Sequence, residues 1–222
     1  MNTSLTPQPT LDKDTPHIGR RRILLALGVA ALPLLQGCFP VVATGVGAGA
    51  AMVADRRTSG TYVEDEGIEW KVSARIRERL GDMAHVNVTS YNRNVLLTGE
   101  APSENMRAQL NEVVAAVENV RGVVNEVVVG PNSTLSARAN DTLITSNVKA
   151  RFVDAQRFSA HSVKVVTEAN VVFLLGIVTR AEADAAAEIA RTSKGVRKVV
   201  RVFEYISEEE ARRRDNPTNA KR

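Results

Sequence analysis

The most distinctive reactive side chain in this sequence is a single thiol, because Cys38 is the only cysteine in the chain. It follows an apolar stretch at residues 23–35, which begins after three consecutive arginines at residues 20–22, and Gly37 immediately precedes it. A positively charged start, a short apolar run and a small residue before the cut are the anatomy of an export signal. A lone thiol also excludes a disulfide within the chain, so packing must stabilise the folded part.

This segment resembles a bacterial lipoprotein signal, in which the peptide is cut before the cysteine. The resemblance implies a signal peptide at residues 1–37 and a Cys38 that carries a diacylglycerol and an N-acyl chain such as palmitate, with no other cofactor. Attachment by more than one acyl chain is stable. Phe39 stands where the family uses an aspartate for retention in the inner membrane. The implied location is therefore the periplasmic face of the outer membrane, with the protein lipid-anchored.

Two alternatives stay open for this amino-terminal segment. An uncut transmembrane anchor would occupy residues 23–54, but Pro33 and Pro40 interrupt the apolar run where a spanning helix is continuous. The three arginines also resemble a weak twin-arginine motif, so the route of export is not decided.

The segments that flank the folded part are predicted to be flexible. Residues 38–61 are small and glycine-rich, which predicts a tether, and their glycines lack the flanking strand and helix that a dinucleotide site needs. Residues 208–222 are highly charged and nearly free of apolar side chains, which predicts a disordered tail with a short frayed helix at its start.

Between these segments the sequence contains two copies of one unit, which predicts two small domains. The copies are 76 residues apart at the start, 77 in the middle and 73 at the end, so the second helix is expected to be shorter in the second copy. The matched segments are residues 72–76 with 148–152, 84–85 with 160–161, 86–88 with 163–165, 95–99 with 172–176, and 122–123 with 195–196.

Hydrophobic periodicity predicts the order helix, strand, strand, helix, strand in each copy. In the first copy an apolar stripe from Ile68 to Leu80 predicts the first helix, and Gly122 is expected to stop the second. The hairpin is antiparallel, and the helical crossover makes the last strand parallel to its neighbour. Both helices are expected to cover one sheet face. The predicted strands are residues 86–89, 95–98 and 123–129.

The second copy carries clear capping signals. Asn140 or Asp141 is expected to cap its first helix, and Thr179 with Glu182 forms a capping box for its second. The predicted elements are helices at residues 141–155 and 181–193 and strands at residues 162–167, 171–175 and 196–205.

Two units of this order, each with an apolar strand that ends in Gly99 or Gly176 and a later Gly-Val pair, resemble the BON domain. Residues 87–89, 95–99, 140–142 and 163–168 carry most of the similarity. Behind a lipoprotein signal, the pair is similar to dual-BON outer-membrane lipoproteins. The resemblance implies an α+β fold of two tandem BON domains, at residues 62–131 and 138–207, each a three-stranded mixed sheet covered on one face by two helices.

No group of residues has the pattern of a catalytic or metal site, so the protein is not expected to be an enzyme or to bind a metal. His85 and His161 occupy matching positions before a strand, which favours a repeated turn residue over a pair of metal ligands. The carboxylates lie mostly on predicted polar helix faces, where charges are ordinarily solvated.

The two copies differ in charge. Residues 64–130 hold seven basic and eleven acidic side chains, a net of 7 − 11 = −4, whereas residues 141–206 hold ten and seven, a net of 10 − 7 = +3. An anionic lipid surface would attract the second copy. An ordinary soluble face explains so modest a charge equally well. The basic residues cluster at the last turn and strand of the second copy, and they are Lys194, Arg197, Lys198 and Arg201.

The family resemblance implies that the first helix of the second domain faces the membrane, which assigns lipid binding to Leu143 and Ile144 at its start. The spacing of Ile144 also places it on the core stripe of that helix, whereas Leu143 lies about 100° away and is expected to point outward. Relatives often carry an aromatic residue at the position of Leu143. Leucine lacks the amphipathic ring that bilayer interfaces favour, so weaker insertion is expected.

Trp70 lies off the apolar stripe of its helix, so it is expected to contact a partner, the membrane or the other domain, and the contact with the other domain is favoured. Nucleic acid is excluded as a partner because the basic residues lack interleaved aromatics and the export signal removes the protein from the cytoplasm. The sequence thus favours a non-enzymatic lipoprotein that binds anionic phospholipid of the outer membrane and supports its integrity. The alternative is an adaptor for an envelope protein partner, such as cell-wall remodelling or outer-membrane assembly machinery.

Overall fold

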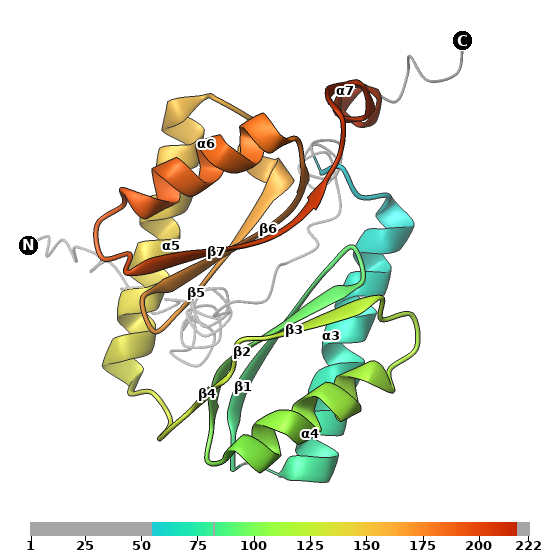
Figure 1. Cartoon of the computed structure of the whole chain (residues 1–222), viewed down its shortest axis with the longest axis vertical. Coiled ribbons are helices and arrows are strands. Elements are labelled where there is room, and N and C mark those ends of the chain that lie inside the picture. The colour runs from blue at the N-terminus through green and yellow to red at the C-terminus, as the bar shows by residue number, and fades with distance from the viewer. Residues whose placement is uncertain (1–54, 82, 217–222) are drawn as a thin grey trace, which may run out of the picture. The chain divides into compact units, whose positions relative to one another are not determined.

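The computed structural model describes residues 55–81 and 83–216, all of which lie within one compact unit, residues 44–222. They fold into two successive α+β domains, and Figure 1 shows two helices on one face of the sheet in each domain. This architecture confirms the predicted fold class. The predictions on the signal peptide, on Cys38 and on residues 39–54 of the tether fall outside the described residues.

The first domain follows the predicted order of elements. Strands β1 (His85–Tyr91) and β2 (Asn94–Ala101) form the antiparallel hairpin, and β3 (Gly122–Asn125) pairs parallel with β2. Helix α3 (Ser59–Leu80) precedes the hairpin, and its buried side includes the predicted apolar stripe. Helix α4 (Glu104–Ala115) provides the crossover, and Ser103 caps it.

The last strand of the first domain is interrupted, although one continuous strand was predicted. Strand β4 (Val128–Val129) pairs with β2 separately from β3, so this sheet has four strands. Between β3 and β4 the side chain of Asn125 accepts a hydrogen bond from the backbone N–H of Val127 at 3.2 Å. Val127 lies between β3 and β4, and its side chain is buried in the core of the first domain.

The second domain has an uninterrupted three-stranded sheet. Strands β5 (Val163–Glu168) and β6 (Val171–Val178) are antiparallel, and β7 (Lys198–Tyr205) is parallel to β6. Helix α6 (Arg180–Arg191) begins with the predicted capping box of Thr179 and Glu182, which is confirmed.

The first helix of the second domain, α5 (Leu135–Ala155), begins earlier than predicted. Thr134 is its N-cap, since its hydroxyl accepts a hydrogen bond from the backbone N–H of Ala137 at 3.2 Å. Asn140 and Asp141 are therefore inside the helix, and the prediction that one of them caps it is wrong. Aspartate is a common capping residue, but Asp141 is buried and its carboxylate accepts hydrogen bonds from the hairpin turn of the same domain.

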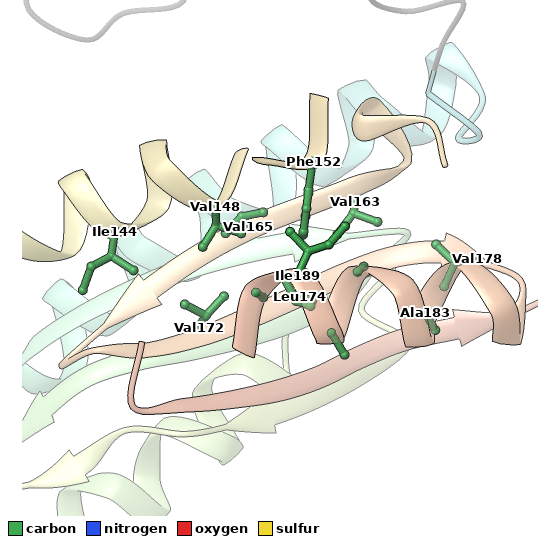
Figure 2. Close-up of a cluster of buried hydrophobic side chains, with 13 residues drawn as sticks. Ile144, Val148, Phe152, Val163, Val165, Val172, Leu174, Val178, Ala183 and Ile189 are labelled. Atoms are coloured by element: carbon green, nitrogen blue, oxygen red, sulfur yellow. The ribbon is translucent and has the colours of Figure 1, made fainter. Parts of the chain in front are cut away.

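Helices and sheet enclose an aliphatic core in each domain. In the second domain Figure 2 shows Val148 and Phe152 of α5, Val165 and Leu174 of the sheet and Ile189 of α6 directed into one cluster. A corresponding cluster fills the first domain. Small alanines on the buried side of α6 let that helix approach its sheet closely.

A third cluster lies on the opposite faces of the two sheets and combines residues of both domains. Leu96 of β2 and Phe173, Leu175 and Ile177 of β6 belong to it, and all four are buried. Along β6 the alternate residue Leu174 faces the helices instead. Both faces of each central strand are therefore buried. The helices cover one face and the other domain covers the second.

The structure changes the alignment of the two copies at their last shared segment. Helices α4 and α6 both contain 12 residues, so the predicted shortening of the second helix is wrong. After each helix one residue has positive φ, Asn119 at 67° and Gly195 at 88°. These two residues are 76 apart, so Gly195 corresponds to Asn119 rather than to Gly122. An asparagine tolerates the left-handed conformation and takes the place of glycine here.

Two glycines mark the same close approach in both hairpins. A Cβ on Gly99 would lie 2.0 Å from the carbonyl oxygen of His85, and one on Gly176 would lie 2.5 Å from that of Ser162. Any larger residue would push the neighbouring strand away. The repeated strand-Gly pattern therefore reflects strand packing within each sheet.

The carboxyl-terminal segment begins with a short helix, as predicted. Helix α7 (Glu208–Asp215) is capped by Ser207. Ala211 in this helix is buried. Residues 217–222 of the predicted tail lie outside the described part of the chain.

Candidate functional site

The first helix of the second domain places Leu143 on the surface and Ile144 in the core. Leu143 is 69% exposed, whereas Ile144 is 3% exposed and packs in the cluster beneath α5. Successive helical positions are about 100° apart around the axis, so only one of the two side chains faces outward. The prediction that Ile144 binds lipid is therefore wrong, because the side chain is enclosed by its own domain.

Three of the predicted basic residues lie in the turn that leads into β7 and at the first position of that strand. The exposed members are Lys194, Arg197 and Lys198. This turn packs against α5, since a Cβ on Gly195 would lie 3.0 Å from Cγ1 of Ile144. Leu143 immediately precedes Ile144 on α5. The structure thus brings the outward leucine and the basic turn to the same end of the domain, and we call these four residues the docking end.

Arg201 differs from the other three basic residues. It lies on β7, where its guanidinium forms an ion pair with Asp184 at 2.6 Å. The hydrogen bond to Asp184 raises the pKa of Arg201. Its charge is matched within the domain, so Arg201 is not part of the docking end.

A buried aspartate fixes the geometry of the docking end. The carboxylate of Asp141 accepts hydrogen bonds from the backbone N–H groups of Ala169 and Asn170, each at 2.9 Å. Both are turn residues with positive φ, at 48° and 63°. The carbonyl oxygen of Asn170 in turn accepts a hydrogen bond from the backbone N–H of Arg197 at 2.9 Å. A bonded path therefore runs from α5 through the hairpin to the basic turn.

The first domain uses the same device at the matching position. The carboxylate of Asp65 accepts hydrogen bonds from the backbone N–H groups of Asn92 and Arg93, at 2.9 and 2.7 Å. Sequence reasoning missed this role, although the two aspartates are 76 residues apart and share the repeat.

Trp70 does not lie between the two domains. It is 74% exposed on α3, so the favoured prediction of an inter-domain contact is wrong. The two domains meet through their sheet faces instead, and α3 lies on the other side of its sheet. Val63, two helical turns earlier, is also exposed. A partner contact at Trp70 stays a prediction.

Sequence reasoning also missed a buried arginine before α3. The side chain of Arg56 is 3% exposed and forms ion pairs with Glu182 of α6 at 2.6 Å and with Asp215 of α7 at 2.8 Å. It also donates a hydrogen bond to the carbonyl oxygen of Ile177 at 3.0 Å. Burial opposes ionisation of Glu182, but hydrogen bonds from Arg56 and Thr179 outweigh it, so the pKa of Glu182 lies below its ordinary value.

The neighbouring Arg57 contacts the first domain. Its guanidinium pairs with Asp65 at 2.8 Å and lies over the ring of Tyr91, 4.1 Å from the ring centre. Adjacent arginines thus contact the two domains separately. The predicted flexible tether must be shortened at its carboxyl end, since residues 55–57 are held by ion pairs and α3 begins at Ser59. The signal available in the sequence was the cluster Asp55-Arg56-Arg57 directly after an apolar segment.

The two histidines are not equivalent in the structure. His85 lies in β1, with its Nδ1 atom 3.1 Å from Oε2 of Glu100, whereas His161 is exposed in the short 3-10 helix η2 (Ala160–Ser162). In the two hairpins the matching glycines, Gly99 and Gly176, approach the carbonyl oxygens of His85 and Ser162. His85 therefore corresponds to Ser162 in the second copy. The prediction that both histidines occupy one matching turn position is therefore wrong by one residue.

Among the helices of residues 55–81 and 83–216, none has the length and apolar character needed to cross a membrane. Cys38 lies before this part of the chain, so its acylation stays a prediction.

The sequence matches known proteins along most of its length. The BON domain model matches residues 65–131 and 140–207, one match for each domain. Outer membrane lipoprotein DolP of Haemophilus influenzae is 38% identical over 185 residues, which cover 82% of this chain and 95% of DolP. The 21 kDa hemolysin of Actinobacillus pleuropneumoniae is 36% identical over 154 residues, 68% of this chain and 79% of the hemolysin.

A solved structure with detectable similarity is the C-terminal domain of CdsD, from the type III secretion system of Chlamydia trachomatis. It is 12% identical, the match covers 62% of this chain and 96% of that domain, and the TM-score is 0.27. A score this low supports no argument. The two domain matches and the long DolP match carry the assignment: this chain belongs to the BON domain family, as a dual-BON protein similar to DolP.

Proposed function

We propose that the protein is a non-enzymatic, lipid-anchored component of the outer membrane whose second BON domain docks on anionic phospholipid at the periplasmic face. The similar protein DolP is an outer membrane lipoprotein, which supports this location. The observation that carries the docking proposal is the exposed Leu143 beside the basic turn of Lys194, Arg197 and Lys198.

The internal repeat supports the choice of the second domain. With the copies aligned at 76 residues, Leu143 corresponds to Gly67, Lys194 to Glu118 and Lys198 to Gly122. The first domain therefore lacks the apolar side chain and keeps one of the three basic residues, Arg121 at the position of Arg197. Its scaffold is the same, so the difference lies in residues that the fold does not require.

The expected strength of docking is modest. Burial of a leucine side chain contributes about 1.5–3 kcal/mol, and each basic residue near an anionic surface contributes about 1 kcal/mol. Such a contact is weak for a freely diffusing protein. An acylated Cys38 would hold the domains at the membrane and raise their effective concentration there, so that weak docking suffices. Docking would then set how the domains lie on the surface while the acyl chains provide attachment.

Vesicle binding tests the proposal. Residues 44–222, the compact unit without the acylated cysteine, are mixed with vesicles of anionic or zwitterionic phospholipid and sedimented. We expect binding to the anionic vesicles, weakened by salt, and little to the zwitterionic ones. Equally poor binding to both would refute the lipid proposal.

Matched variants locate the docking end. Leu143→Glu is expected to weaken binding to anionic vesicles by about tenfold or more, because apolar burial is lost and a repelled charge is added. The control Val153→Glu changes another exposed residue of α5, about ten residues away, and is expected to leave binding nearly unchanged. Likewise, Lys194→Glu with Arg197→Glu should weaken binding, whereas Arg77→Glu with Arg79→Glu, the same charge change in the first domain, should weaken it far less.

An adaptor for an envelope protein partner is the second candidate, and the exposed Trp70 on α3 favours it. On this alternative, Trp70→Ala would abolish rescue of detergent resistance in cells that lack the gene while vesicle binding stays intact. On the lipid proposal, Leu143→Glu abolishes rescue and Trp70→Ala does not.

A further inference from the structure

Three side chains from both domains converge where the hairpin of the first domain meets the second. The donor atoms of His85, Glu100 and Glu168 all lie within 4.8 Å of one another. His85 and Glu100 are directly opposite each other in the β1–β2 hairpin, and Glu168 ends β5. All three lie in the same compact unit.

The two carboxylates are buried without a matching cation. Glu100 is 5% and Glu168 8% exposed. Within residues 55–81 and 83–216, neither forms an ion pair with a lysine or an arginine, and the basic group in contact with Glu100 is the His85 imidazole, 3.1 Å away. Buried charges in proteins are ordinarily paired or bound to a metal. No lysine or arginine among the described residues pairs with these two carboxylates, so a bound cation would balance them.

Neutral donors hold the carboxylates in position. Oε2 of Glu168 accepts hydrogen bonds from Nδ2 of Asn87 at 2.7 Å and from Oγ1 of Thr98 at 3.3 Å. Oε2 of Glu100 accepts one from the backbone N–H of Ser133 at 3.1 Å. Outer donors of this kind orient the ligands of metal sites. In the described part of the chain no hydrogen bond reaches Oε1 of either glutamate, so each keeps an oxygen for a ligand.

The geometry points to a divalent metal site formed by His85, Glu100 and Glu168, which joins the first BON domain to the second. One imidazole nitrogen and two carboxylates, with further positions left for water, are a ligand set that Zn²⁺ accepts. Two donors on one ion are separated by at most twice the bond length, about 4.2 Å for Zn²⁺, so only a small closure of the cluster is needed. The imidazole disfavours Ca²⁺ and Mg²⁺, which prefer oxygen donors.

Two of the three proposed ligands face a cleft that an ion can enter. His85 and Glu168 line a cleft of about 440 Å³ between β1, α5 and β5. Arg138 and Lys149 also line the cleft, but Arg138 donates its hydrogen bonds to Ser133 rather than to either glutamate. No metal site was expected from the sequence, because Glu168 is distant in the chain from His85 and Glu100 and His85 was interpreted as a turn residue.

The inference is independent of lipid docking and is tested on the full chain. The purified protein is stripped with a chelator and titrated with Zn²⁺, Mn²⁺, Ca²⁺ and Mg²⁺ by calorimetry, and thermal unfolding is followed in parallel. We expect one equivalent of Zn²⁺ to bind with an accompanying rise in Tm, and Ca²⁺ and Mg²⁺ to bind far more weakly. Absence of this equivalent would overturn the proposal.

Single substitutions assign the ligands. His85→Gln and Glu168→Gln should each weaken Zn²⁺ binding by at least about 10–100-fold, since even outer residues of metal sites have effects of that size. His161→Gln removes the exposed histidine and should leave the affinity unchanged. Undiminished affinity in either of the first two variants would refute the assignment. If a variant unfolds, histidine NMR of the unsubstituted protein decides instead: Zn²⁺ must shift the imidazole resonances of His85 and leave those of His161 in place.

Discussion

At the scale of single residues, the repeat separates side chains that build the fold from side chains that give each domain its own chemistry. Both copies keep the buried aspartates and the strand glycines. His85 corresponds to Ser162, and Leu143 to Gly67. The shared residues satisfy backbone groups or allow close packing, whereas the unshared ones lie at the surface or between domains. Function is therefore best sought where the copies differ.

Arg56 provides the sharpest residue-scale prediction. Arg56→Gln is expected to lower the free energy of unfolding by about 2–4 kcal/mol, because removal of one partner leaves Glu182 partly buried without its cation. Chemical denaturation measures the change. As a matched control, Asp215→Asn should cost less than about 1 kcal/mol, since the Asp215 side chain is 39% exposed and solvent screens its ion pair. Equal effects of the two variants would show that burial of Arg56 is not the cause.

The limits of sequence reasoning are also clearest for single residues. The sequence predicted Leu143 as an outward residue because helical spacing fixes the direction of each side chain, and the structure agrees. It did not predict the partners of Arg56, which are more than 100 residues away in the chain. Local patterns report local geometry, so contacts between distant segments leave almost no trace in them. The metal ligands proposed above escaped detection for the same reason.

At the scale of elements, periodicity predicted helices and strands well and their ends less well. The order of elements and the capping box of α6 are confirmed. The start of α5 was misplaced because a buried polar residue was interpreted as a cap. The second helices were predicted to differ in length because a Gly-Val pair was matched where the structure aligns Gly195 with Asn119. Both errors have the same origin. An aspartate can cap a helix or bind a turn, and a glycine can follow a helix or begin a strand, so the residue type alone does not identify its position.

The buried aspartates yield the element-scale prediction. Asp141→Asn is expected to lower the free energy of unfolding by about 1–3 kcal/mol, because the amide cannot accept hydrogen bonds at both atoms and leaves a turn N–H unsatisfied. Thermal or chemical unfolding measures this change. Asp154→Asn, which alters an exposed residue of the same helix, should change the stability by less than about 0.5 kcal/mol.

At the scale of the whole molecule, the two domains are coupled through their sheets. Each central strand buries one row of side chains against its own helices and the alternate row against the other domain. The consecutive apolar residues 95–97 of β2 and 171–175 of β6 indicate burial on both faces. The identity of the second covering layer was not predictable from them, because any apolar surface satisfies the same pattern.

Substitutions at two adjacent residues of β6 therefore test separately the stability of the second domain and the packing between the two domains. Leu174→Ala opens a cavity in the core of the second domain, whereas Phe173→Ala opens one between the sheets; each should cost about 2–5 kcal/mol. Hydrogen exchange distinguishes them. Leu174→Ala should increase exchange mainly in the second domain, while Phe173→Ala should also increase it in β2 of the first domain, because Leu96 loses its packing partner. If Phe173→Ala leaves protection in β2 unchanged, the domains fold without support from each other, and the sheet contact positions them without stabilising them.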